Sequence, residues 1–396
     1  MSALGLFGIL MSMAGFRFAR ANESRSRFIM FVLLLLVHIG ASIAGYLYAQ
    51  QNASDAGLYY NDTLGIYGTE IGVSTIFLVN LTQFLKSYFG GSLFDYFLLF
   101  QAAGFWGILF IMRSFDDIHR ELGQDKFKNI YLLLFLPGLH FWTSGLGKDG
   151  LMLLAVAMCT WAAFRLQSRY IAFGTGVAIA LLVRPHIALF ALVAFALTLM
   201  VGRGTSLLTR AALLAVVVAG IASVAGLVES IVYGLNFSSA DSMTEFLETK
   251  SQVSEESGAN LNITGASFPV RLLSLLFQPF FFDANGVFGY IASVENLVLL
   301  WVMVTLVRRA GTALAVARAA VFARFACFFV VMMIFVLSLF HYNVGLGLRQ
   351  KMMIMPALLV LLAATLAVRT ARKGTVYDPV ASPYAGQLEV QGYRRA

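Results

Sequence analysis

Long apolar runs, separated by short polar turns, extend through most of the chain. About ten of them approach or exceed the roughly 20 residues that an α-helix needs to cross a bilayer. They cover residues 28–48, 93–112, 129–144, 149–165, 170–184, 185–202, 209–229, 287–307, 325–342 and 352–369. Because the apolar residues are continuous rather than alternating, the runs predict helices and not the strands of a membrane barrel.

The composition supports a membrane protein. Of the 396 residues, 59% are hydrophobic and 12% are charged, and the mean hydropathy is +0.80, whereas soluble domains carry about 25% charged residues. Residues 1–16 are also apolar, but a basic stretch follows them and no small-residue cleavage site. They could be an uncleaved signal-like start, a re-entrant piece or an eleventh span. The predicted fold is all-α and polytopic, with about 10–11 transmembrane helices in a single domain, residues 1–369.

The basic residues orient the predicted helices. If Arg17–Arg27 lies in the cytoplasm and the spans alternate, most of the 28 basic residues face the cytoplasm, as the positive-inside rule requires. The net charge of +8 then reflects topology, with basic loops facing anionic membrane lipids, and it indicates no nucleic-acid partner. We expect a multi-pass protein of the bacterial cytoplasmic (inner) membrane, with the polar, disordered tail 370–396 in the cytoplasm.

Two long loops are predicted on the outer surface, at about 49–92 and 230–286. The first begins with SDAGLYYND, residues 54–62, and continues into 72–90, where apolar residues at helical spacing predict an amphipathic helix in the interface. The second begins with acidic residues and ends in 268–282, which predicts another interfacial helix.

Several short polar motifs are predicted at the same outer surface. They are FWTSGLGKDG at 141–150, VRPH at 183–186 and HYNVGLGLRQK at 341–351, together with acids near the start of the eighth span. Charged groups at membrane depth usually face a cavity or a partner. The candidate substrate-binding residues in and beside these motifs are Lys148, Asp149, Arg184, His186, Arg271, Asp283, Glu295, Arg349 and Lys351.

Each of these residues also has a simpler explanation. Asp55 could be a solvated loop acid, and Asp149 could cap the helix that begins beside it. Arg184 could extend its charge towards the headgroups, and Arg349 and Lys351 could anchor a helix at the interface. The histidines and cysteines show no metal-ligand spacing, so the sequence predicts no cofactor and supports no divalent metal site.

Taken together, cations and a carboxylate beside lipid suggest a specific chemistry. Cations suit a phosphate or pyrophosphate, and a phosphate this close to the bilayer belongs most naturally to a lipid carrier. A carboxylate within reach could deprotonate an attacking hydroxyl. We therefore predict glycosyl transfer from a polyprenyl-phosphate-linked sugar to a hydroxyl acceptor. Asp55 would be the base, and Tyr59 and Tyr60 would stack on sugar or seat the loop.

The chain resembles the GT-C superfamily of integral membrane glycosyltransferases. In that family the first long extracytoplasmic loop carries a catalytic Asp near tyrosines and is followed by an interfacial helix, which Asp55, Tyr59, Tyr60 and residues 72–90 match. Many GT-C enzymes carry a second acid directly after the first, whereas here Ala56 follows Asp55, and Asp62 is the alternative base.

The later motifs resemble uncharacterised bacterial membrane proteins of polysaccharide-assembly clusters. They are LPGLHFWTSGLGKDG, LLVRPH, FQPFFFDANG with the Glu295-Asn296 pair, and NVGLGLRQK. The resemblance extends over about residues 28–369 and implies that other polysaccharide-assembly proteins are possible partners.

Two other functions remain open. An O-antigen or exopolysaccharide repeat-unit polymerase or ligase would share the large outer loop and would depend more on arginines than on a loop acid. A non-enzymatic lipid-carrier flippase or transporter would place charges along its spans, whereas these spans are nearly free of charge through their middles.

Overall fold

The computed structural model describes residues 2–19, 25–52, 54–68, 72–122, 125–202, 206–231 and 266–374. Within these ranges the chain is helical and contains no β-sheet. The acidic first part of the second predicted loop and the tail beyond residue 374 lie outside the described residues.

The elements are given in chain order. They are α1 (Ala3–Ala19), α2 (Arg25–Gln51), α3 (Asp55–Asn61), α4 (Thr75–Phe89), α5 (Leu93–Leu122), the 3-10 helix η1 (Asp125–Phe135), α6 (Pro137–Phe141), α7 (Lys148–Ala162), α8 (Leu166–Val183), α9 (Pro185–Met200), α10 (Leu207–Ile231), α12 (Phe268–Phe277), α13 (Gly286–Arg308), α14 (Ala310–Ala319), α15 (Val321–Leu339), α16 (Val344–Gln350), the 3-10 helix η2 (Lys351–Met353) and α17 (Met355–Gly374).

Among the described residues, fewer helices than predicted are both long and apolar enough to cross a membrane alone. By length and apolar composition, five described helices qualify: α2, α5, α8, α13 and α15. A sixth span exists if Val344–Met353 and Met355–Val368, which are bent by 59°, count as one. The predicted spans 149–165 and 185–202 correspond to α7, with 15 residues, and α9, with 16. The all-helical membrane fold is therefore supported, and the count of 10–11 spans is not reached by this criterion.

The predicted span 129–144 is broken in the structure. Residues Asp125–Phe135 form a 3-10 helix, and the short helix α6 begins at Pro137. Proline lacks a backbone N–H and restricts the residue before it to extended conformations. Leu136 accordingly has φ −56° and ψ 126°, outside the helical region. Proline is well tolerated at the first position of a new helix, so the chain ends one helix here and starts another.

The first apolar segment lies along α5. Helix α1 runs parallel to α5: the Ser2 N–H donates to Asp95 Oδ1 at 2.7 Å, and Trp106 Nε1 donates to the Met11 carbonyl at 3.0 Å. A Cβ on Gly8 would lie 2.1 Å from a carbonyl oxygen of α5. Small residues allow such close contact between helix backbones within a membrane. Residues 3–19 therefore belong to the helical bundle.

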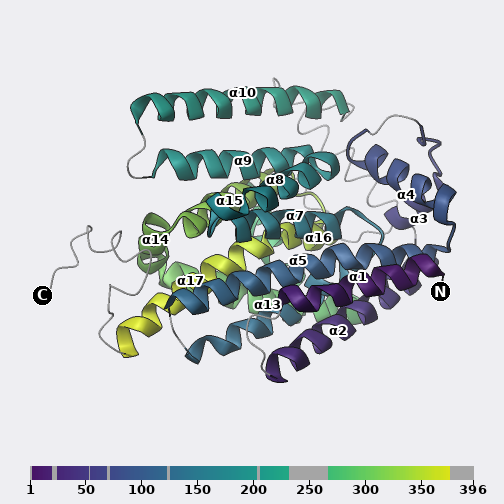
Figure 1. Ribbon diagram of the computed structural model, residues 1–396, viewed down its shortest axis with the longest axis horizontal. Helices are drawn as coiled ribbons and strands as arrows, with labels where there is room; N and C mark the ends of the chain where they lie inside the picture. The colour runs from purple at the N-terminus through teal and green to yellow at the C-terminus, as the bar shows by residue number, and fades with distance from the viewer. Residues whose placement is uncertain are drawn as a thin grey trace, which may run out of the picture.

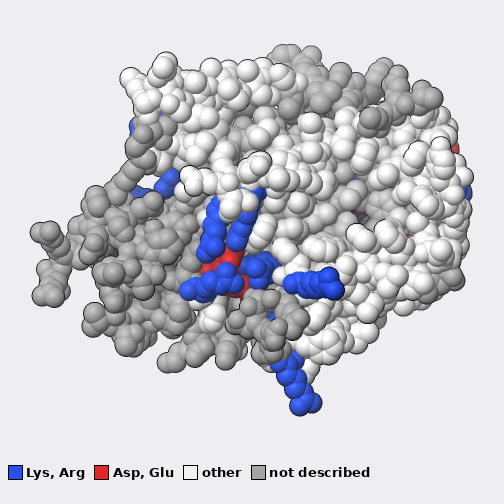
Figure 2. Space-filling view, in the orientation of Figure 1, with Lys and Arg blue, Asp and Glu red and all other residues white. Residues whose placement is uncertain are grey.

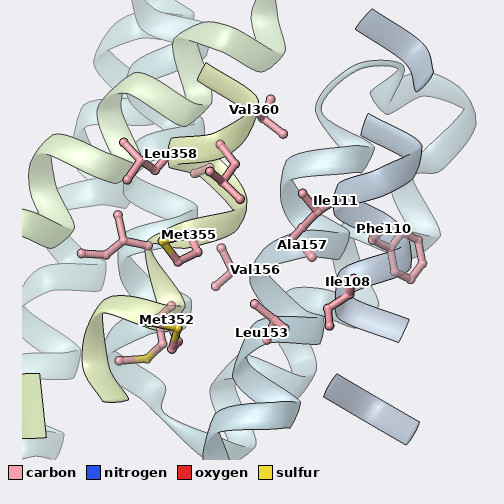
Figure 3. Packing of buried hydrophobic residues seen from close by; sticks show 14 of the residues in the cluster. Ile108, Phe110, Ile111, Leu153, Val156, Ala157, Met352, Met355, Leu358 and Val360 are labelled. Atoms are coloured by element: carbon pink, nitrogen blue, oxygen red, sulfur yellow. The ribbon is translucent and has the colours of Figure 1, made fainter. Parts of the chain in front are cut away.

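Helix α5 lies at the centre of the bundle, and α7 packs between α5 and α17. In Figure 3, Ile108 and Ile111 of α5 face Leu153 and Val156 of α7, and residues of η2 and α17 lie on the far side of α7. A Cβ on Gly104 of α5 would lie 2.0 Å from the Thr143 carbonyl oxygen, which explains the absence of a side chain there.

The short helices α3 and α4 lie together at one end of the bundle (Figure 1). The last turns of α17 and helix α14 lie at the opposite end. Figure 2 shows that most of the described surface in this view carries no charge, with one group of basic side chains around acidic atoms and a few separate charged side chains. A largely uncharged surface is expected for helices that face lipid.

Candidate functional site

Helix α3 carries Asp55 in its first turn. Ser54 caps this helix: its backbone is extended, and its Oγ accepts from the Gly57 N–H. Tyr59 is buried beneath the helix, and the Gln83 side chain of α4 donates to its carbonyl at 2.9 Å. This packing of α3 on α4 fixes where the Asp55 carboxylate points.

Four charged residues from separate sequence motifs meet in one network. Arg349 Nη2 lies 2.8 Å from Asp55 Oδ2 and 2.9 Å from Asp149 Oδ2, and Arg349 Nε also donates to Asp149 at 2.9 Å. Arg184 Nη2 donates to Asp149 Oδ1 at 2.9 Å. Residues of α3, α7 and α16 and of the junction of α8 with α9 thereby meet in one place.

The two acids of the network have different surroundings. The Asp149 side chain is 5% exposed, and each of its oxygens accepts from an arginine. The Asp55 side chain is 49% exposed, and its ion pair is made through Oδ2 with Arg349. Asp149 is therefore suited to hold the two guanidinium groups in position, whereas Asp55 can reach a solute.

Pro185 fixes the position of Arg184. Arg184 follows the last residue of α8 and has φ −147° and ψ 85°, and Pro185 occupies the first turn of α9. Arg184 thus has a non-helical backbone and lies at the junction between α8 and α9. Its Nη1 lies 3.4 Å from Met353 Sδ at the end of η2.

Lys148 is the third cation of the site. Its Nζ donates to Ser74 Oγ at 3.0 Å and to Thr75 Oγ1 at 2.9 Å, at the start of α4. Burial, followed by repulsion from Arg184, lowers the pKa of Lys148 to about 8. None of the ion pairs found among the described residues includes Lys148.

Ser74 and Thr75 were not among the predicted site residues. Ser74 has φ 59°, which is unusual for a residue other than glycine, and its N–H donates to the Leu182 carbonyl at 2.7 Å. This bond ties the start of α4 to the end of α8, beside Arg184. A Ser-Thr pair directly before an amphipathic run is typical of a helix start, which was the available signal in the sequence.

Among the described side chains, the site carries more positive than negative charge, since Lys148, Arg184 and Arg349 lie with Asp55 and Asp149. Burial raises the pKa of the Tyr59 phenol above its ordinary value, and the nearby Asp55 carboxylate raises it further. Tyr59 is therefore neutral and can act only as a hydrogen-bonding or packing group.

Lys351 lies away from this network. Its side chain is 2% exposed and donates to the side-chain oxygen of Asn296 on α13. The neighbouring Glu295 is also buried, and its carboxylate accepts from the Gly138 N–H at 2.5 Å. Lys351 and Glu295 thus belong to a separate buried polar group between α6, α13 and η2. These contacts do not bring Lys351 together with Arg349, although we expected both to hold one ligand.

Two residues of the first loop make local structural contacts. Asp62 has φ 48°, and its oxygens accept from the N–H groups of Ile66 at 2.8 Å and Tyr67 at 3.0 Å. Tyr60 donates to the Gly91 carbonyl at 2.8 Å. Because both oxygens of Asp62 already accept backbone N–H groups, Asp55 is the better-placed base.

The remaining predicted residues also lie outside the network of contacts. Arg271 Nη1 donates to the Leu339 carbonyl at 2.9 Å, and Asp283 Oδ2 accepts from Gln278 at 3.2 Å. His186 packs against Phe190 on α9. Within the described ranges, no group of three or more His, Cys, Asp or Glu side chains is arranged to hold a metal ion.

Comparisons with protein-family models, with curated proteins and with solved structures found no match. The function of the chain is therefore inferred from the arrangement of its own residues.

Proposed function

We propose that the chain is a GT-C-like membrane glycosyltransferase. It moves a sugar from a polyprenyl-phosphate-linked donor to a hydroxyl acceptor, at the outer side of a bacterial cytoplasmic membrane, during assembly of a cell-surface polysaccharide or glycoconjugate. The observation that supports this most directly is the contact of a half-exposed carboxylate, Asp55, with an arginine that Asp149 also holds.

The reaction needs one proton acceptor and a site for a phosphate. The acceptor hydroxyl oxygen attacks the anomeric carbon while the bond from that carbon to the carrier phosphate breaks. The proton passes to Asp55, and the electron pair of the broken bond leaves with the phosphate. A phosphate leaving group is stable as an anion, so one carboxylate suffices and no general acid is required.

The cations would hold the leaving phosphate. Arg184 and Arg349 can each present paired N–H groups to phosphate oxygens, and Lys148 adds a compact positive charge. Preorganised cations of this kind stabilise charge that develops in a transition state. Asp149 keeps both guanidinium groups in place before the substrate arrives.

Substrate binding would also release the base. In the structure, Arg349 bridges Asp55 and Asp149. A phosphate that binds Arg349 competes with Asp55, the more exposed of its two partners. The freed carboxylate then becomes available to the acceptor hydroxyl when the donor is bound.

The proposal is tested by complementation of a strain in which the chromosomal copy is deleted. Wild type, Asp55→Asn and Arg184→Ala are expressed, and their membrane levels are compared before surface glycan is measured. Loss of glycan with both variants at normal membrane levels supports a transferase with this site. Normal glycan with both variants contradicts it.

A second candidate, a repeat-unit polymerase or ligase, is favoured by one feature of the same network. Two arginines converge at the site, while Asp55 is itself engaged by Arg349. An arginine-dependent enzyme of this kind would retain activity in Asp55→Asn and lose it in Arg184→Ala. The same complementation experiment therefore separates the two functions.

A further inference from the structure

Another group of charged side chains lies near the C-terminal end of α5, whereas Asp55 lies near its N-terminal end. Asp116 and Asp117 are buried on this helix, and four arginines from three helices surround them. The ion pairs join Arg27 and Arg113 to Asp116, and Arg120 and Arg169 to Asp117. Figure 2 shows a group of basic side chains around acidic atoms at the surface.

This arginine cluster, defined as Arg27, Arg113, Arg120 and Arg169, is fixed in position by its neighbours. Arg169 Nη1 lies 2.7 Å from Asp117 Oδ2, and its guanidinium stacks 3.9 Å above the centre of the Trp161 ring. Tyr131 donates to Asp116 Oδ1 at 2.7 Å. Rigid placement lowers the entropy that a ligand-binding side chain loses on binding.

Among the side chains that the structure describes, the cluster has more arginines than acidic partners, since four arginines face two aspartates. Two buried donors, Arg113 Nε and Trp161 Nε1, have no hydrogen-bond partner. The aspartate oxygens that lack a hydrogen bond each face an arginine across 3.6–3.7 Å, so their charge is compensated. The two donors, Arg113 Nε and Trp161 Nε1, therefore lack an acceptor, and the surrounding arginines favour an acceptor that carries negative charge.

The depth of the cluster in a membrane indicates the source of that acceptor. Arg113 follows Asp95 by about 18 residues of α5, which at about 1.5 Å per residue is about 27 Å. The hydrocarbon core of a bilayer is about 30 Å thick. The start of α5 contacts α3 through the Tyr60–Gly91 bond, so the cluster and the Asp55 site lie near opposite headgroup layers.

We propose that the arginine cluster binds the phosphate of an anionic phospholipid headgroup, in the leaflet opposite the Asp55 site. The bound phosphate accepts from the arginine N–H groups. This site is separate from the proposed glycosyl transfer and does not depend on it.

The test uses the full chain, purified in detergent and stripped of lipid. Native mass spectrometry measures retention of phosphatidylglycerol, of phosphatidylcholine and of inorganic pyrophosphate. We expect phosphatidylglycerol to be retained preferentially. Equal retention of the two lipids overturns the proposal, and retention of pyrophosphate that phosphatidylglycerol does not displace assigns the cluster to a soluble phosphate instead.

Arg120→Gln is the informative variant. Arg120 is 51% exposed and its ion pair with Asp117 lies within one turn of α5, so its loss breaks no contact between helices. We expect its affinity for phosphatidylglycerol to fall about fivefold, the effect of one basic residue near an anionic membrane. Arg318→Gln is the matched control, an exposed arginine on α14 outside the cluster. Equal losses in the two variants would mean that general surface charge, and not this site, retains the lipid.

Discussion

Asp55 and Arg349 lie 294 residues apart in the sequence, and their side chains form an ion pair with 2.8 Å between Oδ2 and Nη2. This contact joins the first loop to the break between α16 and α17. Broken helices commonly line substrate sites in membrane proteins, because the interrupted backbone there needs protein or water rather than lipid around it. The ion pair therefore lies where the fold itself favours a polar site.

Asp55→Asn should abolish transfer without affecting the fold. The side chain is half-exposed, so its amide should be tolerated, whereas loss of a general base costs about 10²–10⁴-fold in rate. The measurement is the rate of sugar transfer in membranes containing equal amounts of protein. Asp62→Asn is the control, since Asp62 accepts backbone N–H groups in a turn and should retain most activity.

Arg349→Lys should reduce transfer although it keeps the charge. One ammonium cannot reproduce the planar group that contacts both Asp55 and Asp149. We expect a loss of about 10-fold or more in kcat/KM, the effect of about 1.4 kcal/mol in transition-state binding. Arg308→Lys, at the end of α13, should have no effect. A full-rate Arg349→Lys enzyme would show that charge alone is needed at this position.

Donor binding should weaken at alkaline pH because of Lys148. Its pKa is lowered to about 8, so it is largely protonated at pH 7 and largely neutral at pH 9. The protonated form attracts phosphate, and therefore the affinity for a polyprenyl phosphate should fall as the pH rises through 8. Lys148→Arg, which stays charged, should remove this dependence between pH 7 and 9. An unchanged pH profile in this variant would exclude Lys148 as its origin.

Gly104→Ala should destabilise the bundle. A Cβ at this position would lie 2.0 Å from the Thr143 carbonyl oxygen, which is backbone and cannot move aside. Overpacking of this kind costs about 1–3 kcal/mol, and the thermal midpoint of the purified protein should fall. Gly174→Ala on α8 is the matched control, since no atom within 4 Å would meet its Cβ. Similar midpoints for the two variants would contradict the close contact between α5 and the 143 turn.

The charged network could be predicted because charges are rare in this chain and the topology restricts them. Asp55, Asp149, Arg184 and Arg349 interrupt strongly apolar sequence, and the predicted alternation of spans assigns their motifs to one surface. Their pairing could not be predicted, because it depends on side-chain directions. Residues two apart on a helical turn do not share a face, which explains why Lys351 contacts Asn296 while Arg349 contacts the two acids.

The helical class followed from composition, but the number and length of the helices did not. The apolar run 129–144 reads as one span, and the structure divides it at Pro137. Hydropathy alone does not separate a spanning helix from a shorter helix buried among others. Helix α7 is an example, because its 15 apolar residues pack between α5 and α17 (Figure 3).

The most direct test of the central claim is the amount of polyprenyl-linked saccharide in lipid extracts of cells that carry only the Asp55→Asn protein. If Asp55 is the base of a transferase that consumes this donor, the lipid-linked saccharide accumulates relative to cells with wild type or Asp62→Asn, and surface glycan is lost. If the Asp55→Asn cells contain wild-type levels of both, Asp55 is not the base and the proposed site is wrong.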